Sequence, residues 1–509
     1  MRHALAVSYL PVAAALLAGL CNPAIAQSQH WQPATHDFWG VDPSAALRLL
    51  PGQAALAGDL PAASCDEPTP LPVGPLSLQQ AISLALCHSP QTRLAWAAVL
   101  SQAAQLGQAK AAYLPTLNVS ASRSVDNTST QTAGDFASAN ATHVLATGKV
   151  ATMSWLLLDM GGRAANVRQS QQALNAALAS QDAAMQTLFA NTAQAYYDTW
   201  AAQAALDSSR QNEASARETL AAANARVRLG AAIAPEALQA RSALAQASLA
   251  RARAEGTAQL TAGTLAATLG LDARTPLNLV PDAALDADAS DSIAPRDSAT
   301  LTQYLSDIDG LIDRAALDHP SVRAAQAQLA AAQAKHDATV AEGLPTLSAS
   351  VGRYVNGRPN TPLSSSSTRE TLSSLQINFP LFDGFSRNYR VRDTVAQIGA
   401  RRADLAAAKA QASLDVWRSF QTLQAETASV AASAELLRDA AAVVDAAKAR
   451  LRAGAVDLLE LINADRDLAN ARQERIRALA AWRSSRLKLL ASLGRAGFWA
   501  LDSQQTTTR

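Results

Sequence analysis

The tetrapeptide Leu114-Pro115-Thr116-Leu117 recurs 230 residues later as Leu344-Pro345-Thr346-Leu347. The same separation relates Pro90 to Pro320, upstream of each tetrapeptide. Behind each tetrapeptide, apolar and polar residues alternate, a pattern typical of a half-buried strand. A constant separation over many positions is hard to produce by chance, and it indicates that the chain consists of two similar halves.

A second group of matched residues is separated by 224 positions rather than 230. The pairs are Asp159 and Asp383, Arg163 and Arg387, Arg226 and Arg450, Arg228 and Arg452, Gly230 and Gly454, and Glu236 and Glu460. The change in separation places a six-residue difference in one loop, between Ser120 and Asp159. We therefore interpret residues 76–271 and 308–497 as tandem repeats 1 and 2.

Each repeat is predicted to hold a helix, two strands, a very long helix and a return helix. Ala, Leu, Arg, Gln and Glu fill the helical stretches, with almost no Pro or Gly inside them. The first helices are expected to end near Lys110 and Ala341, the long helices to cover Gly162–Leu229 and Phe385–Arg452, and the return helices to end near Leu269 and Leu493.

Apolar residues recur at every seventh position of the second long helix, which predicts a coiled-coil seam. They are Val416, Leu423, Val430, Leu437, Val444 and Leu451. A helix over Phe385–Arg452 would be about 100 Å long, a rod for which an isolated globule has no use. Several shorter helices in a compact bundle are the alternative.

Four short segments alternate apolar and polar residues and are predicted to be strands, two in each repeat. Their apolar positions are Leu117, Val119 and Ala121, then Leu347, Ala349 and Val351, then Leu375, Ile377, Phe379 and Leu381, and the fourth segment runs from Val144 to Leu158. Polar loops are expected at Thr128–Asn140 and Gly357–Ser367. Such alternation suits a barrel wall with one face toward lipid and the other toward water.

The predicted fold is therefore mainly α with a small β part: long antiparallel coiled-coil helices and four transmembrane strands per subunit. Four strands cannot close a barrel, because the sheet would keep two open edges. Three copies would give a twelve-stranded β-barrel, with six long helices closing an α-helical tunnel beneath it. A soluble two-hairpin sheet on a coiled coil is the alternative.

The N-terminus resembles a secretory signal peptide over residues 1–26. An uncharged run from Ala4 to Leu20 follows Arg2, and a small residue stands at Ala26, where cleavage would occur. A membrane helix is the alternative for this segment. Cys21 leaves a lipoprotein signal open, although Leu20 before it fits that signal badly.

The segments outside the repeats have distinct compositions. Residues 27–75 form a Pro/Ala-rich extension, residues 272–307 an acidic linker, and residues 498–509 a tail. After cleavage of the signal, Cys65 and Cys87 remain, and both a bridge between them and two separate thiols are compatible with the sequence.

Composition and motifs argue against several classes of function. The formal net charge is +1, which gives no basic field for nucleic acid. The sequence has no HExxH, no GxSxG and no GxxxxGK[ST] motif, and no histidine stands near a cysteine at metal-ligand spacing. We therefore expect no enzyme activity, no cofactor and no metal. Beyond the signal no uncharged apolar stretch reaches 18 residues, so no transmembrane helix is expected.

The informative polar residues lie at the turns between each long helix and its return helix. A glycine after the long helix, Gly230 or Gly454, fits a left-handed C-terminal cap. The arginines before the glycine interact favourably with the negative end of the long helix dipole, and the acidic residues after it with the positive end of the return helix dipole. This stabilisation of the helices is sufficient to explain both kinds of residue. Repeated by threefold symmetry, Glu460 would also form a carboxylate ring that attracts cations at the narrow end of a tube. Both interpretations stay open for Glu460, whereas for Glu236 the structural one is favoured.

These features together resemble the TolC family of outer-membrane factors over residues 76–497. The matching motifs are Ala85-Leu86 to Pro90 and Ala316-Leu317 to Pro320, the Leu-Pro-Thr-Leu start of each strand pair, the Leu-x-Asp-x-Gly-x-Arg-like exits around Asp159 and Asp383, and the Arg-x-x-Gly turns. The segment Leu86–Arg93 is most similar to the CyaE-like subgroup, which serves type I toxin secretion.

The resemblance implies a homotrimer in the cell outer membrane, in contact with lipid and with a long periplasmic portion. It also implies a periplasmic adaptor protein and an inner-membrane ABC or proton-driven transporter as partners. The periplasmic gate would involve Glu460 and Asn463, with Asp457 and Glu236 as further candidates. The family's restraining tyrosine and arginine would fall at Leu451 and Val456, which cannot form that polar latch.

The same resemblance places the adaptor contact at the two helix turns. The residues concerned are Arg228, Leu229, Gly230 and Ala231 in repeat 1 and Arg452, Ala453, Gly454 and Ala455 in repeat 2. The leading hypothesis is passive export of a protein toxin or small molecules through a partner-driven channel. Drug or metabolite efflux with a proton-driven pump is the first alternative, and an envelope coiled-coil scaffold without a pore is the second.

Overall fold

The computed structural model describes residues 74–131, 139–230, 233–280, 308–357, 367–453 and 457–496. Several predictions fall outside these residues. They are the signal peptide, almost all of the extension at 27–75, the linker from residue 281 to 307, the tail at 498–509, and the turn residues Ala231, Gly454, Ala455 and Val456.

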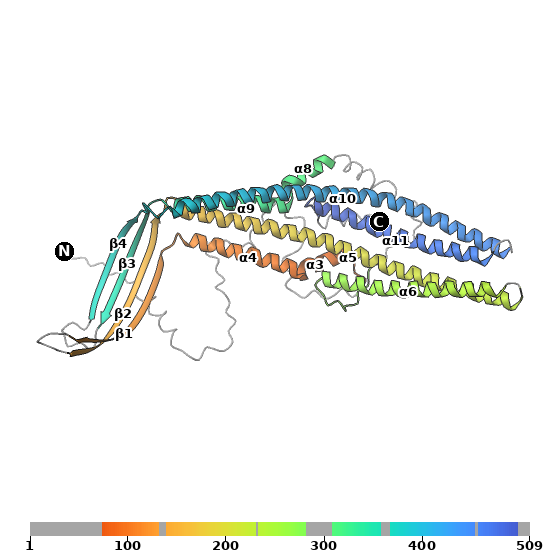
Figure 1. Cartoon of the computed structure of the whole chain (residues 1–509), viewed down its shortest axis with the longest axis horizontal. Coiled ribbons are helices and arrows are strands. Elements are labelled where there is room, and N and C mark those ends of the chain that lie inside the picture. Colours follow the sequence, from red (N-terminus) through yellow and green to blue (C-terminus); the bar gives the residue numbers. More distant parts are fainter. Residues whose placement is uncertain are drawn as a thin grey trace, which may run out of the picture. The chain divides into compact units, whose positions relative to one another are not determined.

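Helices and strands follow one another in the same order in both halves (Figure 1). The first half contains α3 (Leu78–His88), α4 (Pro90–Ala111), β1 (Thr116–Gln131), β2 (Ala139–Leu158), α5 (Gly162–Arg228) and α6 (Ala234–Thr268). The second contains α8 (Ile308–Asp318), α9 (Pro320–Ala341), β3 (Thr346–Gly357), β4 (Ser367–Asn378), α10 (Ser386–Arg452) and α11 (Leu458–Ser492). Both long helices have 67 residues and both return helices have 35. The helical part is thus built twice on the same plan.

The long helices begin at equivalent left-handed turns. Gly161 has φ +97° in the first half, and Phe385 has φ +64° in the second. In both turns an aspartate caps the helix: Oδ2 of Asp159 accepts a hydrogen bond from the Arg163 backbone N–H at 2.5 Å, and Asp383 does the same for Arg387 at 2.8 Å. Phe385 has a positive φ and therefore lies before α10 rather than in its first turn. The helix begins at Ser386, one residue later than predicted.

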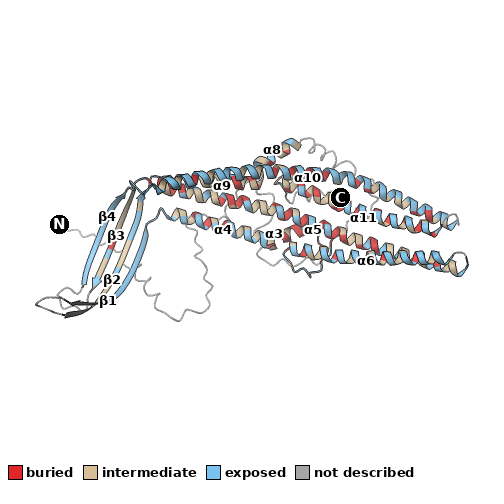
Figure 2. Ribbon diagram, in the orientation of Figure 1, coloured by how far each residue is buried: buried red, intermediate tan, exposed pale blue. Residues whose placement is uncertain are grey.

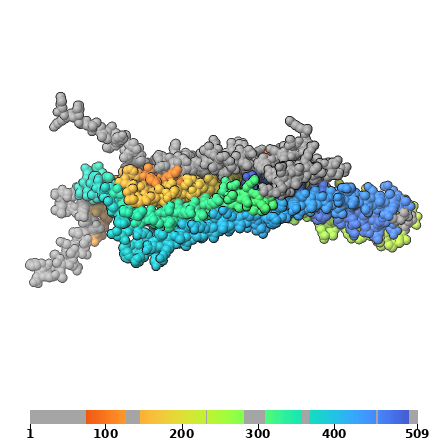
Figure 3. Space-filling view, turned by 90° about the horizontal axis from the view of Figure 1, so that it is seen from above, coloured from red at the N-terminus to blue at the C-terminus, as the bar shows by residue number. Residues whose placement is uncertain are grey.

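The predicted coiled-coil seam of α10 faces the interior of the helical part (Figure 2). Val416, Leu423, Val430 and Val444 are buried, and Leu437 and Leu451 pack half-buried against the same cores. Around the middle of the helices, the largest core joins side chains of α3, α5, α6, α10 and α11, with Phe189 at its centre. The two halves therefore share one packed interior, and Figure 3 shows second-half helices lying directly against α5.

The four strands form one antiparallel sheet in the order β1-β2-β3-β4. Two boundaries differ from the prediction. Phe379 and Leu381 lie beyond β4, which ends at Asn378, because Pro380 has no N–H to donate to a neighbouring strand. The predicted loops at Thr128–Asn140 and Gly357–Ser367 are shorter in the structure, because the strands extend into both segments. Hydrogen bonding between strand backbones does not require apolar side chains.

The two faces of the sheet differ in chemistry, because directly paired residues of neighbouring strands share a face. We call the apolar face the one that carries Leu117, Val119, Met153, Trp155, Leu347, Val351, Leu375 and Ile377. The opposite, polar face carries mainly Thr116, Asn118, Ser120, Thr152, Ser154, Ser348, Ser350, Ser374 and Gln376. Exposed leucines of the apolar face, such as Leu117 at 70% exposure, have no covering layer in the described chain. The helices of the described chain include none apolar and long enough to span a bilayer.

Candidate functional site

The first helix turn joins α5 to α6. The α5 helix ends at Arg228, and Gly230 follows with φ +71°, the left-handed cap expected from the sequence. Its N–H donates to the Val227 carbonyl at 3.1 Å. Leu229 is 83% exposed, so an apolar side chain stands at the tip of this turn.

The second turn joins α10 to α11. Asp457 occupies the N-cap position of α11, and the Glu460 backbone N–H donates to its carbonyl oxygen at 3.2 Å. The Glu460 carboxylate accepts a hydrogen bond from Arg450 in the last turn of α10, which makes an ion pair across the turn. Because both side chains are well exposed, this pair contributes about 0–1 kcal/mol to stability. Arg452 and Ala453 are exposed beside it.

One small core holds the two turns together. Its residues are Ala223 of α5, Ala240 of α6, Val444 and Ala447 of α10, and Leu458, Leu461, Ala464 and Leu468 of α11. Alanine at these positions lets the helices approach closely. The structure therefore brings the four helix ends, predicted separately from the sequence, into one cluster.

The two glutamates at equivalent positions have different surroundings. Glu460 is paired with Arg450, whereas Oε2 of Glu236 is shielded from solvent and has no hydrogen-bond partner in the described residues. Asn463, one turn after Glu460, is exposed and does not join the pair. Of the four gate candidates, only Glu460 is thus held in an ion pair with another described residue.

A polar groove of about 400 Å³ lies between α5, α6 and α11. It was not predicted from the sequence. It is lined by Asn212 of α5, Gln239 and Gln246 of α6, and Asn463, Asp465 and Asn470 of α11, among others. Burial raises the pKa of Asp465, while Lys448 and Arg472 act in the opposite direction. The sequence signal for this groove was the polar row Asn463, Arg466, Asn470 and Gln473, spaced by three or four residues on one helix face.

The sequence profile of outer membrane efflux proteins matches residues 81–271 and 311–495 of this chain. The chain belongs to the outer membrane efflux protein family. The match falls in two segments, one in each of the halves described above. The resemblance to the TolC family is confirmed.

Individual relatives agree with this assignment. Protein CyaE of Bordetella pertussis is 35% identical over 453 residues, which cover 89% of this chain and 90% of CyaE. The outer membrane protein VceC of Vibrio cholerae has 19% identity and a TM-score of 0.66, covering 82% of this chain and 96% of VceC. The Campylobacter jejuni CmeC outer membrane channel has 16% identity and a TM-score of 0.66, covering 85% and 90%.

Membership of the outer membrane efflux protein family places this chain in the outer membrane, with a periplasmic portion, as a transport protein. The mainly helical fold with a small antiparallel sheet matches the fold of VceC and CmeC. The gate residues, the adaptor contacts and the domain boundaries stay predictions.

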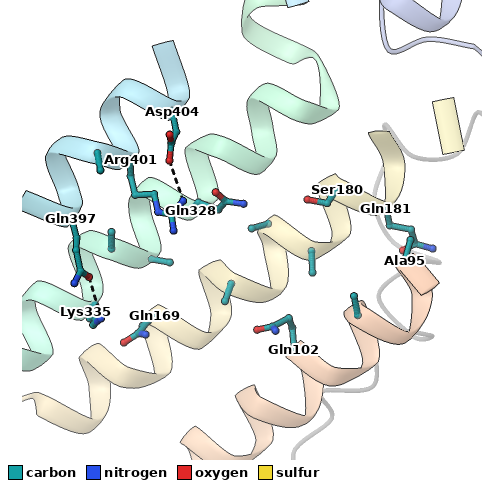
Figure 4. Close-up of a pocket in the computed structure, with 17 residues that line it drawn as sticks. Ala95, Gln102, Gln169, Ser180, Gln181, Gln328, Lys335, Gln397, Arg401 and Asp404 are labelled. Carbon is teal, nitrogen blue, oxygen red and sulfur yellow. Dashed lines mark hydrogen bonds and ion pairs between the residues drawn. The ribbon is translucent and has the colours of Figure 1, made fainter. Parts of the chain in front are cut away.

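A second pocket, of about 740 Å³, lies between α4, α5, α9 and α10 (Figure 4). Gln102, Gln169, Gln181 and Gln328 line it among alanines, with Lys335 bonded to Gln397 at 3.1 Å and Arg401 paired with Asp404 at 3.0 Å. The glutamine amides offer hydrogen bonds, whereas the alanine methyl groups offer only apolar surface. Among the described residues no three His, Cys, Asp or Glu side chains gather in a way that could hold a metal ion.

Cys87 is disulfide-bonded in the structure. The sequence was compatible with both a disulfide and a free thiol at this position. The other two cysteines, Cys21 and Cys65, lie outside the described residues.

The groove yields a pH-dependent prediction for Asp465→Asn. A carboxyl whose pKa is raised in the folded state supports stability below its ordinary value of 3.8 and loses that contribution as the pH rises through the folded value. We therefore expect Asp465→Asn to raise the unfolding midpoint at pH 7 and to leave it nearly unchanged at pH 3. Circular dichroism melts at both pH values test this, with the exposed Asp467→Asn as control. A midpoint that falls at pH 7 would contradict the prediction.

Proposed function

We propose that this chain is one subunit of a trimeric export channel, whose strands close as a twelve-stranded barrel across the outer membrane. The observation that supports this most is the sheet, whose outer strands β1 and β4 each have a single neighbour in the described chain. An open sheet with an exposed apolar face is an aggregation site in water. Pairing β1 of one copy with β4 of the next removes both edges, and in lipid the apolar face becomes favourable.

Helical surfaces support the same assembly. Leu238, Leu249 and Leu260 of α6 and Trp417, Leu436 and Val443 of α10 are all exposed in the single chain. Six such side chains on two helices suit contacts with neighbouring copies, because association would remove their apolar surface from water. In the trimer, the paired hairpins α5–α6 and α10–α11 would form the tunnel wall, with the two turns at its periplasmic end.

For the cargo and partners we propose type I secretion of a protein toxin, with a periplasmic adaptor and an inner-membrane ABC transporter. The relative CyaE, similar along almost the whole chain, supports this choice. The exposed Leu229 and Ile233 supply an apolar surface for the adaptor at the first turn, beside the exposed Arg228 and Gly230. At the second turn the exposed Arg452 and Ala453 would contact it. Small-molecule efflux with a proton-driven pump is the second candidate, which agrees with the description of the family as efflux proteins. In either case the chain acts as a channel and not as an enzyme.

Planar-bilayer recording of the purified protein tests the pore. A channel gives discrete, uniform conductance steps, whereas an envelope scaffold gives none. To separate the two cargo candidates, the gene should be deleted in its host and both toxin export and drug susceptibility measured. Loss of toxin export with unchanged drug susceptibility supports type I secretion, and the reverse result supports efflux.

We predict that Glu460→Ala weakens the cation preference of single channels. Glu460 is paired with Arg450, so its loss leaves three arginines without their carboxylate partners at the narrow end of the trimer. A unit charge at 4 Å contributes about 1 kcal/mol in water, or about fivefold in local cation occupancy. Reversal potentials in a salt gradient measure the change. Glu474→Ala is the matched control, since Glu474 also lies on α11 and pairs with an arginine, Arg477. Equal changes in reversal potential in both variants, or no change in Glu460→Ala, would contradict a role for Glu460 in the gate.

A further inference from the structure

Four cations stand on the apolar face of the sheet, one on each strand. Arg123, Lys149, Arg353 and Arg369 are all exposed, and their positions in the register put them on this face. We call them the basic belt. Among the residues of the described strands, this face carries no Asp or Glu, whereas the polar face carries Glu370.

The members of the basic belt are neighbours in a chain across the sheet. Arg123 pairs with Thr147, two residues from Lys149, and Lys149 pairs with Val355, two residues from Arg353. Arg353 pairs with Thr371, two residues from Arg369. Such diagonal neighbours lie about 7–8 Å apart, so each cation repels the next unless an anion sits between them.

Aromatic side chains mark the other end of the same face. Trp155 lies on β2 six residues from Lys149, which is about 20 Å along a strand. Phe379, Phe382 and Phe385 are exposed where β4 leads into α10. In membrane barrels an apolar band about 25 Å tall is bounded by aromatic residues at the interface. The aromatic end adjoins the helices. Because barrel strands tilt by about 40°, the basic belt lies about 15 Å from Trp155 across the band, and its long side chains extend toward the opposite boundary.

We propose that the basic belt binds the phosphate groups of glycolipids in the outer leaflet of the outer membrane, of the lipid A type. This rests on the proposed function, because the face meets lipid only if the strands span the membrane. Long Lys and Arg side chains extend from an apolar surface to the headgroup region, and guanidinium groups bind phosphate through two parallel hydrogen bonds. A row of cations without carboxylates matches a surface of repeated anionic headgroups.

Binding of lipid A to the detergent-solubilised full chain tests the proposal. Binding isotherms are compared for bisphosphorylated lipid A and for the same lipid after enzymatic removal of its phosphates. We expect a preference approaching three orders of magnitude for the phosphorylated form, since each of the four cations beside an anionic surface contributes roughly fivefold in affinity. Equal affinity for the two lipids would overturn the proposal, and this comparison needs no variant.

Variants locate the binding on the belt. The quadruple change R123Q/K149Q/R353Q/R369Q should abolish the preference for phosphate, while R123K/R353K/R369K, which keeps every charge, should retain most of it. The control R253Q/R402Q/R418Q/R438Q removes four exposed helical arginines and should bind as the unmodified protein does. Equal losses in the quadruple variant and the control would contradict a role for the belt.

The bilayer recordings distinguish the two proposals. A conducting protein without phosphate preference overturns the lipid proposal alone. Phosphate preference in a protein that never conducts overturns the channel and leaves the belt as a lipid-binding surface.

Discussion

Phe189→Ala is expected to lower the free energy of unfolding by about 3–5 kcal/mol, because it empties the centre of the largest core. Phe189 is fully buried on α5 and packs in the cluster to which five helices contribute. The loss combines the transfer of a phenyl ring to water with a cavity that neighbouring helices fill only in part. Thermal or guanidinium unfolding at fixed protein concentration measures it, since oligomer stability depends on concentration.

The matched control for Phe189 is Leu94→Ala. Leu94 lies on α4 at 74% exposure and is not among the side chains proposed for contacts between subunits, so this change should stay within about 0.5 kcal/mol. Similar losses for both variants would show that the core is not where the structure places it.

Gly270→Ala is expected to destabilise the protein by about 2–4 kcal/mol, because the position combines a left-handed backbone with a close contact. Gly270 has φ +76°, and a Cβ there would stand 2.6 Å from the carbonyl oxygen of His88. Backbone atoms cannot move aside as a flexible side chain can. The equivalent Gly494 has φ +68° and would meet Pro320 at 2.6 Å. Gly494→Ala should therefore behave alike.

Gly256→Ala provides a control of opposite sign for Gly270. Gly256 lies inside α6, and a Cβ would find nothing within 4 Å. Alanine there should stabilise the helix by about 0.5–1 kcal/mol. The same change from glycine to alanine is therefore expected to stabilise the protein at position 256 and to destabilise it at position 270. Unfolding midpoints of the variants, measured together, test both. Destabilisation by Gly256→Ala or tolerance of Gly270→Ala would contradict the structure at these positions.

Much of the helical architecture could be predicted from the sequence, because its determinants are local and repeated. The heptad from Val416 to Leu451 located the buried face of α10, and the position of Gly230 located a turn. Strand ends were less predictable. The backbone pairs polar residues such as Thr128 as readily as apolar ones, so β1 and β2 run further than the alternation of their side chains.

The candidate site shows where equivalence in sequence stops. Arg226 and Arg450 match, as do Glu236 and Glu460, yet only the second arginine pairs with its glutamate. Likewise Arg163 stacks on the Tyr113 ring at 4.7 Å and donates to the Leu156 carbonyl of its own repeat's strand, whereas Arg387 donates to the Gly343 carbonyl at 3.0 Å. These differences depend on contacts with neighbouring helices, which cannot be read from the spacing of residues in the sequence. The raised pKa of Asp465 was missed for the same reason.

The central claim is that one chain has too little sheet to close and must assemble with others. Light scattering of the detergent-extracted protein, corrected for bound detergent, measures the number of chains per particle. The account predicts three chains per particle, with strand signal retained in circular dichroism. A single chain that stays dissolved in water without detergent, with no strand signal, would contradict it.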